Sequence, residues 1–474
     1  MSVFDTLNKS SVLPGQPGFA NQFVLSHLKT SLMNRQILRL AIPNIISNIT
    51  VPLLSMADLS IMGHLESEVY IGAIALGGLI FNFIYAFFSF LRMGTSGFTA
   101  QAHGEENRQE MILMLGRGLF LAFFGGFLMI LLQRPIDLLS FMLIEGSPEV
   151  EALAREYFYI RIFAAPASLG IMAFSGWFIG MQNARIPMVI AIFVNVTNIL
   201  FNVLFVYGLG MKSDGVALGT LIAQYLGLGL AFIFFRRYYR DHMDFWVRSE
   251  FFNMRKLKRF FAVNADIIIR TICLIFAFAF FTAESAKFGD TILAVNTVLL
   301  QFLFLFSYLT DGFAHAAEAL VGKFTGRRDS SGLSRVVRLL FLWGLGLSIP
   351  FTLAYVIAGK NLMYILTDNP EVIEAASPFL FWLGLIPLVT FAAFIWDGIY
   401  IGATASVPMR NTLLISTFLI FLPAYYLLYP VIGNHGLWLA MMLFMAGRGI
   451  MLTIFAGKHI PGINRSPGNG NPNR

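Results

Sequence analysis

The stretch Ile42–Leu65, IPNIISNITVPLLSMADLSIMGHL, is apolar and long enough to cross a membrane as a helix, yet it carries one carboxylate and two prolines. An ionised Asp at the centre of a bilayer costs about 2.5–3.5 kcal/mol, so such residues usually face a bundle interior or a wet cavity. Asp58 is therefore the first candidate functional residue, and a permanent ion pair or a helix cap is the alternative. Pro43 and Pro52 each free a backbone carbonyl one turn earlier, which predicts a helix that bends.

Composition places the chain among integral membrane proteins. Hydrophobic residues make up 57% and charged residues only 12%, whereas about a quarter of the residues of soluble proteins are charged. A single cysteine, Cys273, excludes both a disulfide framework and a thiolate metal site. The net charge of +7 does not indicate nucleic-acid binding, because the basic residues of membrane proteins collect in cytoplasmic loops.

Segments of membrane-spanning length recur along the chain and predict twelve helices. They lie at about 38–63, 69–93, 112–132, 156–179, 187–208, 215–235, 261–283, 291–316, 337–356, 376–400, 410–429 and 436–456. The loops on one side are much richer in Arg and Lys, most densely between Arg236 and Arg259. The positive-inside rule therefore places that side, with both termini, in the cytoplasm.

The sequence repeats itself with an offset of 222 residues, from Pro148 in GSPEV to Pro370 in DNPEV and from Gly180 to Gly402. Six helices per half is an even number, so both halves begin on the same side and the repeat is parallel. The predicted fold is an all-α polytopic membrane protein, with two six-helix lobes related by a pseudo-twofold axis along the membrane normal. Such lobes enclose a cleft that can open to either face by rocking, whereas a channel more often assembles around the axis of several identical chains.

These features predict five regions. They are a cytoplasmic arm at 1–34, an N-lobe at 35–235 with helices 1–6, a basic cytoplasmic linker at 236–259, a C-lobe at 260–457 with helices 7–12, and a cytoplasmic tail at 458–474.

Several motifs are spread over about residues 35–456. They are Asp58 followed by Gly63-His-Leu, Asn198-x-x-x-Asn202, Val263-Asn-Ala-Asp266-x-x-x-Arg270, the run TDGFAHAAEALVG at 310–322, and Trp396-Asp-Gly-x-x-Ile-Gly-Ala-Thr404. With these motifs the chain resembles the multidrug and toxic compound extrusion (MATE) transporters, and looks most like the branch of DNA-damage-inducible protein F relatives. The resemblance implies a cation-driven antiporter that extrudes amphipathic, often cationic, compounds across a bacterial inner membrane.

One position departs from the family pattern. In several members the place of Asn202 is taken by an aspartate that works beside the helix-1 aspartate, so the resemblance leaves Asp58 as the obvious titrating group of the N-lobe. We expect a polar pocket around Asp58, although each of its members could instead join helices by hydrogen bonds worth ~0.6 kcal/mol. The candidates are Asn82 and Tyr85 on helix 2, Asn195, Asn198 and Asn202 on one face of helix 5, and Thr220 and Gln224 on helix 6.

The C-lobe is richer in ionisable groups. Asp266 and Arg270 are four residues apart on helix 7, which favours a neutralised structural pair over a transport role. A further group could hold Na⁺, since hard cations prefer several oxygen ligands, or could be a network in which Arg448 compensates an acid. Its members are Asp311, His315 and Glu318 on one face of helix 8 and Asp397 on helix 10.

Other classes of protein fit less well. Gly94-Thr-Ser-Gly97 matches a motif of intramembrane serine proteases, but the N-lobe offers no histidine base at mid-membrane. The sequence has no H-E-x-x-H, P-loop or G-x-G-x-x-G motif, which argues against an enzyme and against a nucleotide-driven pump. A flippase of lipid-linked sugars in the same superfamily would require a deep cationic groove.

The predicted function is secondary antiport in exchange for H⁺ by alternating access, with Na⁺ coupling as an alternative. Deprotonated Asp58 would stabilise the state that accepts substrate, and its protonation from outside would favour release, because burial disfavours the charged form of a carboxylate. The expected partners are small amphipathic molecules and membrane lipids, and not nucleic acid. We expect a monomer without a cofactor or a bound metal.

Overall fold

The computed structural model describes residues 19–63, 68–144, 146–460 and 462–463. Within these ranges the chain is helical and contains no strand. The described ranges contain twelve helical segments that are long and apolar enough to cross a membrane, which confirms the predicted number. Of the predicted features, His64, Leu65, most of the terminal arm and most of the tail lie outside the described residues.

The first half contains six spans, several of them built from two helices. They are α2 (Phe19–Gly63); α3 (Glu68–Phe87) with α4 (Phe90–Gly104); α5 (Arg108–Leu131), continued by α6 (Gln133–Leu143); α7 (Pro148–Arg161) with η1 (Ile162–Ala164) and α8 (Ala165–Gly180); α9 (Arg185–Val203) with the π-helical turn η2 (Leu204–Gly208); and α10 (Ser213–Tyr239). A linker of η3 (Arg240–Phe245) and α11 (Arg248–Phe251) follows.

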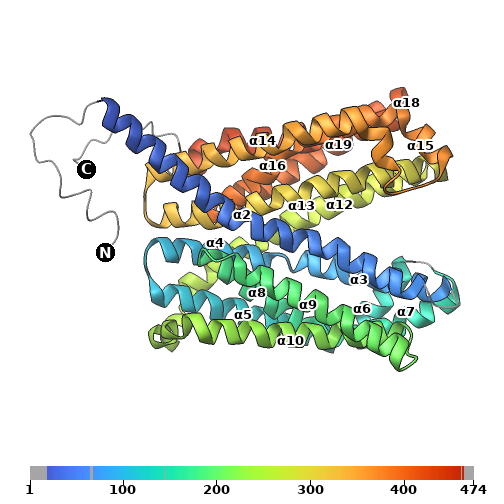
Figure 1. Ribbon diagram of the computed structural model, residues 1–474, viewed down its shortest axis with the longest axis horizontal. Helices are drawn as coiled ribbons and strands as arrows, with labels where there is room; N and C mark the ends of the chain where they lie inside the picture. Colours follow the sequence, from blue (N-terminus) through green and yellow to red (C-terminus); the bar gives the residue numbers. More distant parts are fainter. Residues whose placement is uncertain (1–18, 64–67, 145, 461, 464–474) are drawn as a thin grey trace, which may run out of the picture.

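The second half repeats this order. Its spans are α12 (Met254–Ala286); α13 (Asp290–Gly326); α14 (Ser330–Met363); α15 (Pro370–Ala376) with η4 (Ser377–Phe379) and α16 (Leu380–Gly402); α17 (Ser406–Ile415) with the π-helical turn η5 (Ser416–Phe421) and α18 (Leu422–Ile432); and α19 (Asn434–His459). The two halves form two bundles that lie side by side (Figure 1).

The same backbone turns are built twice. Glu106 and Arg328 have φ of 57° and 56°, and Gln182 and Thr404 have φ of 64° and 52°. Residues other than glycine rarely adopt this left-handed conformation. The members of each pair are 222 residues apart, which is the offset of the sequence repeat. The repeat that is seen in the sequence is therefore also present in the backbone structure.

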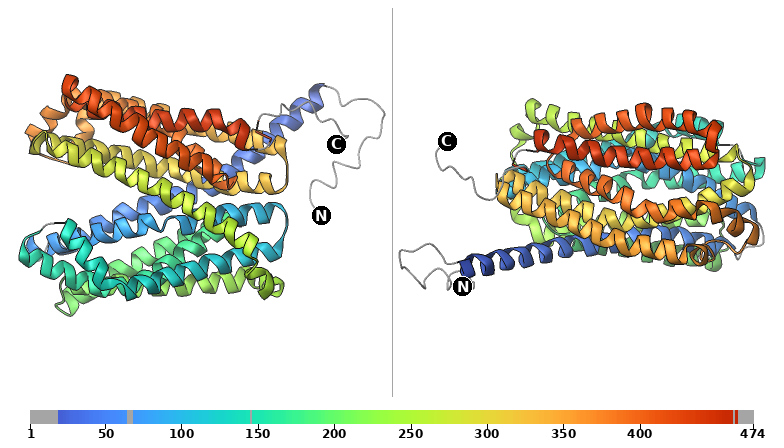
Figure 2. Two further views of the ribbon diagram at one scale, coloured as in Figure 1. Left: turned by 180° about the vertical axis from the view of Figure 1, so that it is seen from behind. Right: turned by 90° about the horizontal axis from the view of Figure 1, so that it is seen from above.

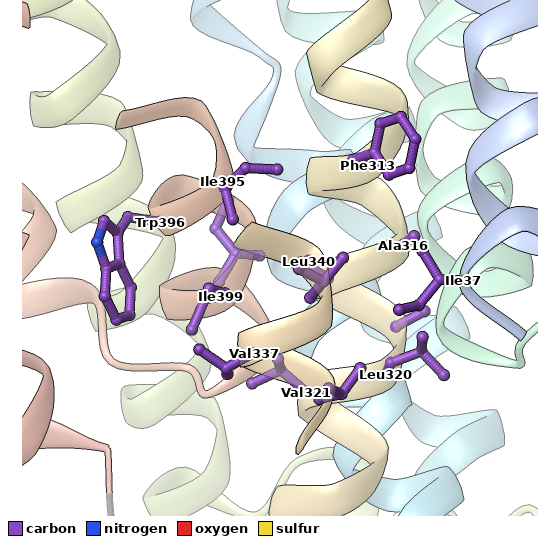
Figure 3. Packing of buried hydrophobic residues seen from close by; sticks show 14 of the residues in the cluster. Ile37, Phe313, Ala316, Leu320, Val321, Val337, Leu340, Ile395, Trp396 and Ile399 are labelled. Carbon is purple, nitrogen blue, oxygen red and sulfur yellow. The ribbon is translucent and has the colours of Figure 1, made fainter. Parts of the chain in front are cut away.

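The helices α2 and α12 cross between the bundles (Figures 1 and 2). Although α2 begins the first half, its Ile37 is fully buried in a core built mainly by α13, α14 and α16, beside Ala316 and Leu320 (Figure 3). The start of α12 packs in turn against the first bundle, where the rings of Phe260 and Phe98 lie 5.5 Å apart. Part of α2 therefore packs in the second bundle, and part of α12 packs against the first.

The prediction for α2 differs from the structure in its length. The helix begins at Phe19 rather than near residue 38, and it continues without interruption through Pro43 and Pro52. Near Pro52 both bundles hold it: Asn195 of α9 donates to the carbonyl of Thr50 at 3.2 Å, and the Asn48 side chain donates to the carbonyl of Tyr308 in α13 at 3.0 Å.

Two glycines bring the bundles into backbone contact at the end that carries the basic loops. A Cβ on Gly104 of α4 would lie 2.1 Å from the carbonyl oxygen of Lys323, and a Cβ on Gly326 of α13 would lie 2.1 Å from that of Gln101. Only glycine permits so close an approach. The two contacts are related by the pseudo-twofold axis, and together they close the space between the lobes at this end.

Candidate functional site

A chain of hydrogen bonds connects α2 to α9 and α10 through Asp58. The Asn202 side-chain amide donates to Asp58 Oδ1 at 2.8 Å and to Asn198 Oδ1 at 2.9 Å, and Asn198 donates to Thr220 Oγ1 at 2.8 Å. Asn198 and Asn202 are 1% and 0% exposed. Asn198, Asn202 and Thr220 therefore lie where the prediction placed them, beside Asp58.

A glycine of α10 makes room for this arrangement. A Cβ on Gly219 would lie 2.1 Å from Asn202 Oδ1, so α10 can approach α9 here only without a side chain. If the amide of Asn198 is turned over, its nitrogen lies 3.2 Å from Asp58 Oδ1 and its oxygen accepts from Thr220. In both orientations the partners of Asp58 are neutral amides. Asp58 forms no ion pair with any residue that the structure describes.

A tyrosine and an arginine of α7 lie next to this group and were not predicted as site residues. The Arg161 guanidinium donates to the Tyr157 hydroxyl and lies over the ring of Phe81, 4.8 Å from its centroid. It is close enough to Asp58 to act on it electrostatically. The sequence signal was Arg161 itself, a charged residue within a membrane-spanning segment, which by default indicates a functional site.

The remaining predicted pocket residues are not hydrogen-bonded to the Asp58 chain in the part of the protein that the structure describes. Asn195 bonds the backbone of α2 at Thr50, as an interhelical contact. Asn82 is exposed and lines a separate cleft between the lobes. The hydroxyl of Tyr85 is buried and has no partner in the described part of the chain. Gln224 is partly buried on α10, and no hydrogen bond connects it to Asp58.

This central cleft has a volume of about 840 Å³ and lies between α3 and α4 on one side and α12, α13 and α16 on the other. Its walls are mainly apolar, with aromatic side chains such as Phe83, Phe278 and Phe304. Toward the basic end, the cleft is lined by Glu318 and Ile401. The glycine contact at Gly326 lies further along α13 in the same direction. The arrangement suits an amphipathic molecule, because ligand sites are mostly apolar with a few placed polar groups.

Most of the charged groups in the cleft are paired. Glu318 is 1% exposed and binds Arg92 of the opposite lobe at 3.1 Å. Asp397 accepts from two arginines, Arg270 of α12 and Arg448 of α19, the second at 2.7 Å. The network interpretation, with Arg448 compensating Asp397, therefore describes these residues better than a cation site does. Among described residues, no group of three or more His, Cys, Asp or Glu is arranged to hold a metal ion.

Two polar residues of α13 in the cleft have no charged partner. Asp311 accepts only a hydrogen bond from Ser307, at 3.3 Å, and forms no ion pair within the described ranges. One helical turn further on, His315 also lines the cleft, and its Nδ1 is buried without a partner among the residues described. Asp311 is therefore the carboxylate of the cleft that remains available to a ligand.

The predicted pair between Asp266 and Arg270 is not formed. Asp266 instead accepts from Arg410 at 2.7 Å and from Ser406 at 2.6 Å, both on α17, while Arg270 binds Asp397. The spacing of four residues allowed a contact along one helix. Asp266 and Arg270 instead turn to different neighbours, where each finds a partner of opposite charge: Arg410, which is partly buried, and Asp397, which is buried.

Comparisons with known proteins agree with this geometry. Residues 43–204 and 267–427 match the MatE family model, one match in each half of the chain. The chain is 36% identical to DNA damage-inducible protein F of Escherichia coli strain K12 over 89% of its length and 91% of the relative's. It is 23% identical to the probable multidrug resistance protein NorM of Thermotoga maritima, over 89% of this chain and 92% of that protein.

Solved structures show the same fold. An outward-facing multidrug resistance MATE family transporter has a TM-score of 0.82 at 18% identity, covering 92% of this chain and 97% of its own. The bent form of the Vibrio cholerae MATE transporter VcmN has a TM-score of 0.81 at 16% identity, covering 92% and 98%. With a family match in both halves and a relative above 30% identity along most of its length, this chain belongs to the MatE family of membrane transporters.

Proposed function

We propose that this protein exports amphipathic compounds in exchange for H⁺, with Asp58 as the proton-coupling residue. The observation that carries the proposal is the surroundings of Asp58: a carboxylate inside a membrane bundle, bound by neutral amides and without an ion pair in the described structure. Such a carboxylate can gain and lose a proton without breaking a charge pair. In a membrane protein an ionisable residue of this kind is by default functional.

The local chemistry favours H⁺ over Na⁺. A sodium site requires several oxygen ligands that converge on one point. At Asp58 the Asn202 amide presents its nitrogen rather than its oxygen, because it donates to both Asp58 and Asn198. In several members of the family an aspartate at this position supplies a second carboxylate beside the helix-1 aspartate. Here the position is Asn202, so that second carboxylate is missing as a ligand for Na⁺. A proton needs only the one carboxylate.

Movement of α2 would couple the proton to the lobes. When Asp58 is ionised, the Asn202 hydrogen bond ties the later part of α2 to the first bundle, while Ile37 anchors the earlier part in the second. Protonation weakens that bond, because a hydrogen bond to a charged acceptor is roughly twice as strong as a neutral one. The proton would shift the populations of two lobe arrangements by this difference in free energy.

The central cleft indicates the class of substrate. Its apolar and aromatic walls suit a lipophilic body, and Asp311 is a carboxylate without an arginine partner in the described chain. A lipophilic cation matches both features. A flippase for lipid-linked sugars is disfavoured because Arg92 and Arg270 are engaged with acids and leave no cationic groove for pyrophosphate.

We place the protein as a monomer in the bacterial cytoplasmic membrane, with both termini inside, as its basic loops predict. The test of function is efflux of a lipophilic cation from proteoliposomes with H⁺ and Na⁺ gradients imposed separately. We expect efflux with the H⁺ gradient alone. Efflux driven equally by Na⁺ without a pH gradient would overturn the proposed coupling, and the absence of cation efflux under both gradients would overturn the proposed substrate class.

A further inference from the structure

A second cavity lies outside the central cleft, at the basic end of the first bundle, and we call it the linker groove. It has a volume of about 780 Å³ and lies between α5, α8 and α10, where the linker covers it. Most of its walls are apolar. They include Leu115 and Leu119 of α5, Phe174 of α8, Phe232 and Phe235 of α10, and Trp246 of the linker.

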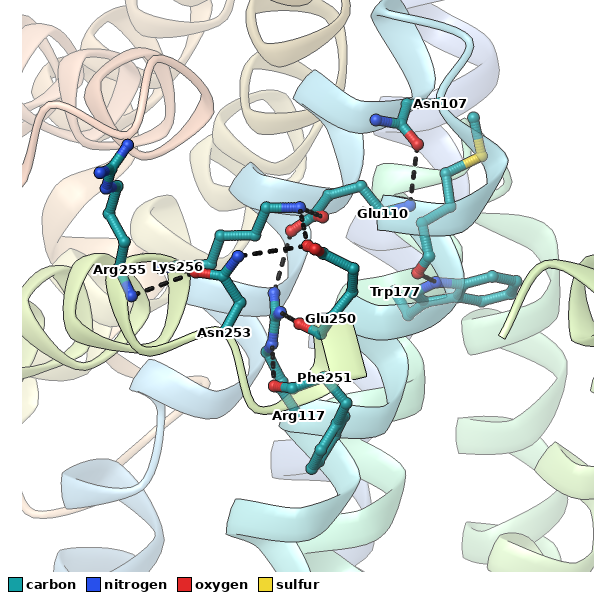
Figure 4. Close-up of polar contacts among 10 residues, drawn as sticks. Asn107, Glu110, Arg117, Trp177, Glu250, Phe251, Asn253, Arg255 and Lys256 are labelled. Carbon is teal, nitrogen blue, oxygen red and sulfur yellow. Dashed lines mark hydrogen bonds and ion pairs between the residues drawn. The ribbon is translucent and has the colours of Figure 1, made fainter. Parts of the chain in front are cut away.

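The linker that covers the groove is docked firmly on the first bundle (Figure 4). Arg117 of α5 is 1% exposed and donates to Glu110 at 2.9 Å, to the carbonyl of Glu250 at 2.7 Å and to that of Phe251 at 3.3 Å. Lys256 adds ion pairs to Glu110 and Glu250, at 2.8 and 3.1 Å. Removing one partner from a buried charge network strongly destabilises a protein. These contacts therefore hold the linker in a fixed position on the first bundle.

The position of Trp246 shows the same close fit. A Cβ on Gly116 would lie 2.5 Å from the indole ring, so the ring rests directly on the backbone of α5. Trp246 as a whole residue is still 38% exposed. Tryptophan is enriched at the level of lipid headgroups, where its ring meets both the apolar core and the polar surface.

The rim of the groove is basic. Arg236 lies in the last turn of α10 and Arg240 begins η3, and both line the groove. Both are exposed and neither forms an ion pair with a described residue. One acid, Asp244, also lines the groove, so the two arginines leave an excess of positive charge. Guanidinium groups bind phosphate oxygens through paired hydrogen bonds.

We propose that the linker groove binds an anionic phospholipid, with its phosphate at Arg236 and Arg240 and an acyl chain along Leu119 and Phe232. Apolar walls below two unpaired arginines match the two parts of such a lipid, and a basic pocket on the cytoplasmic side is where anionic headgroups are found. This groove shares no lining residue with the central cleft, and Asp58 is not part of it. The proposal therefore does not depend on the proposed coupling ion or substrate.

The experiment uses the full-length protein, purified in detergent and stripped of lipid. Phosphatidylglycerol with brominated acyl chains is added, and quenching of tryptophan fluorescence is followed. We expect saturable quenching that is largely lost in Trp246→Phe, which assigns it to the groove. Arg236→Gln/Arg240→Gln should bind about 10- to 30-fold more weakly. Brominated phosphatidylcholine should bind more weakly to the wild type.

The matched control is Arg335→Gln/Arg338→Gln, which removes the same charge from the basic end of α14, away from the groove. It should bind like the wild type, and the thermal unfolding midpoint of each variant verifies that it is folded. The proposal is overturned if the two double variants bind equally, if phosphatidylcholine quenches as well as phosphatidylglycerol, or if quenching survives intact in Trp246→Phe.

Discussion

The contacts of Gly104 with Lys323 and of Gly326 with Gln101 lead to a specific prediction about how the two lobes close at the basic end. In Gly326→Ala, the new methyl group would lie 2.1 Å from the Gln101 carbonyl oxygen, whereas ordinary contact begins near 3.4 Å. The lobes must therefore separate by about 1.3 Å at this end, or the helices must distort. Overpacking of this kind typically costs about 1–3 kcal/mol. We expect that cost to fall on the arrangement that is closed at the basic end.

The assay combines the thermal unfolding midpoint with gradient-driven efflux in proteoliposomes. Gly326→Ala and its pseudo-symmetric counterpart Gly104→Ala should both lower the midpoint and slow efflux. The double variant should cost less than the sum of the two, because a separation that relieves one contact also relieves the other. Gly346→Ala is the control, since its Cβ would meet nothing within 4 Å. Single variants that behave like Gly346→Ala would refute the closed contact.

Three further outcomes test the site. Asp58→Asn should abolish H⁺-driven efflux but leave the unfolding midpoint near that of wild type, and normal efflux would remove Asp58 from the mechanism. Asn202→Asp places a second carboxylate where the amide now lies 2.8 Å from Asp58; two like charges cannot both ionise easily there, so the pH profile of efflux should move to higher pH, and an unshifted profile with normal expression would contradict this. Asp397→Asn should destabilise the protein by about 3–5 kcal/mol, because Arg270 and Arg448 both lose their charged partner; an unchanged midpoint on thermal unfolding would show that neither arginine depends on it.

The helices of this chain were predictable because the bilayer imposes a local rule. A span needs about 20 apolar residues, and its backbone must satisfy its own hydrogen bonds. Length and hydrophobicity are read directly from the sequence, so twelve spans were predicted, and the described residues contain twelve helical segments long and apolar enough to cross a membrane. The ends were less predictable: α2 starts at Phe19, where the sequence is too polar to be recognised as part of a span.

The candidate site was predictable only in part. Asn198 and Asn202 lie one helical turn apart, so they were expected to share a face, and both hydrogen-bond in the chain that leads to Asp58. Asn82 fitted a helical pattern equally well, yet it lines the central cleft. Periodicity states which residues of one helix face the same way. It does not state which neighbouring helix they face.

From the sequence alone follow the membrane class, the twelve spans, the duplication and Asp58 as an intramembrane carboxylate. Only the tertiary structure decides which residues form ion pairs with one another. Asp266 binds Arg410 rather than Arg270, and Glu318 binds Arg92 of the opposite lobe. The physical reason is that a contact between helices depends on their crossing and rotation, which are set by packing over the whole bundle and have no local signature in the chain.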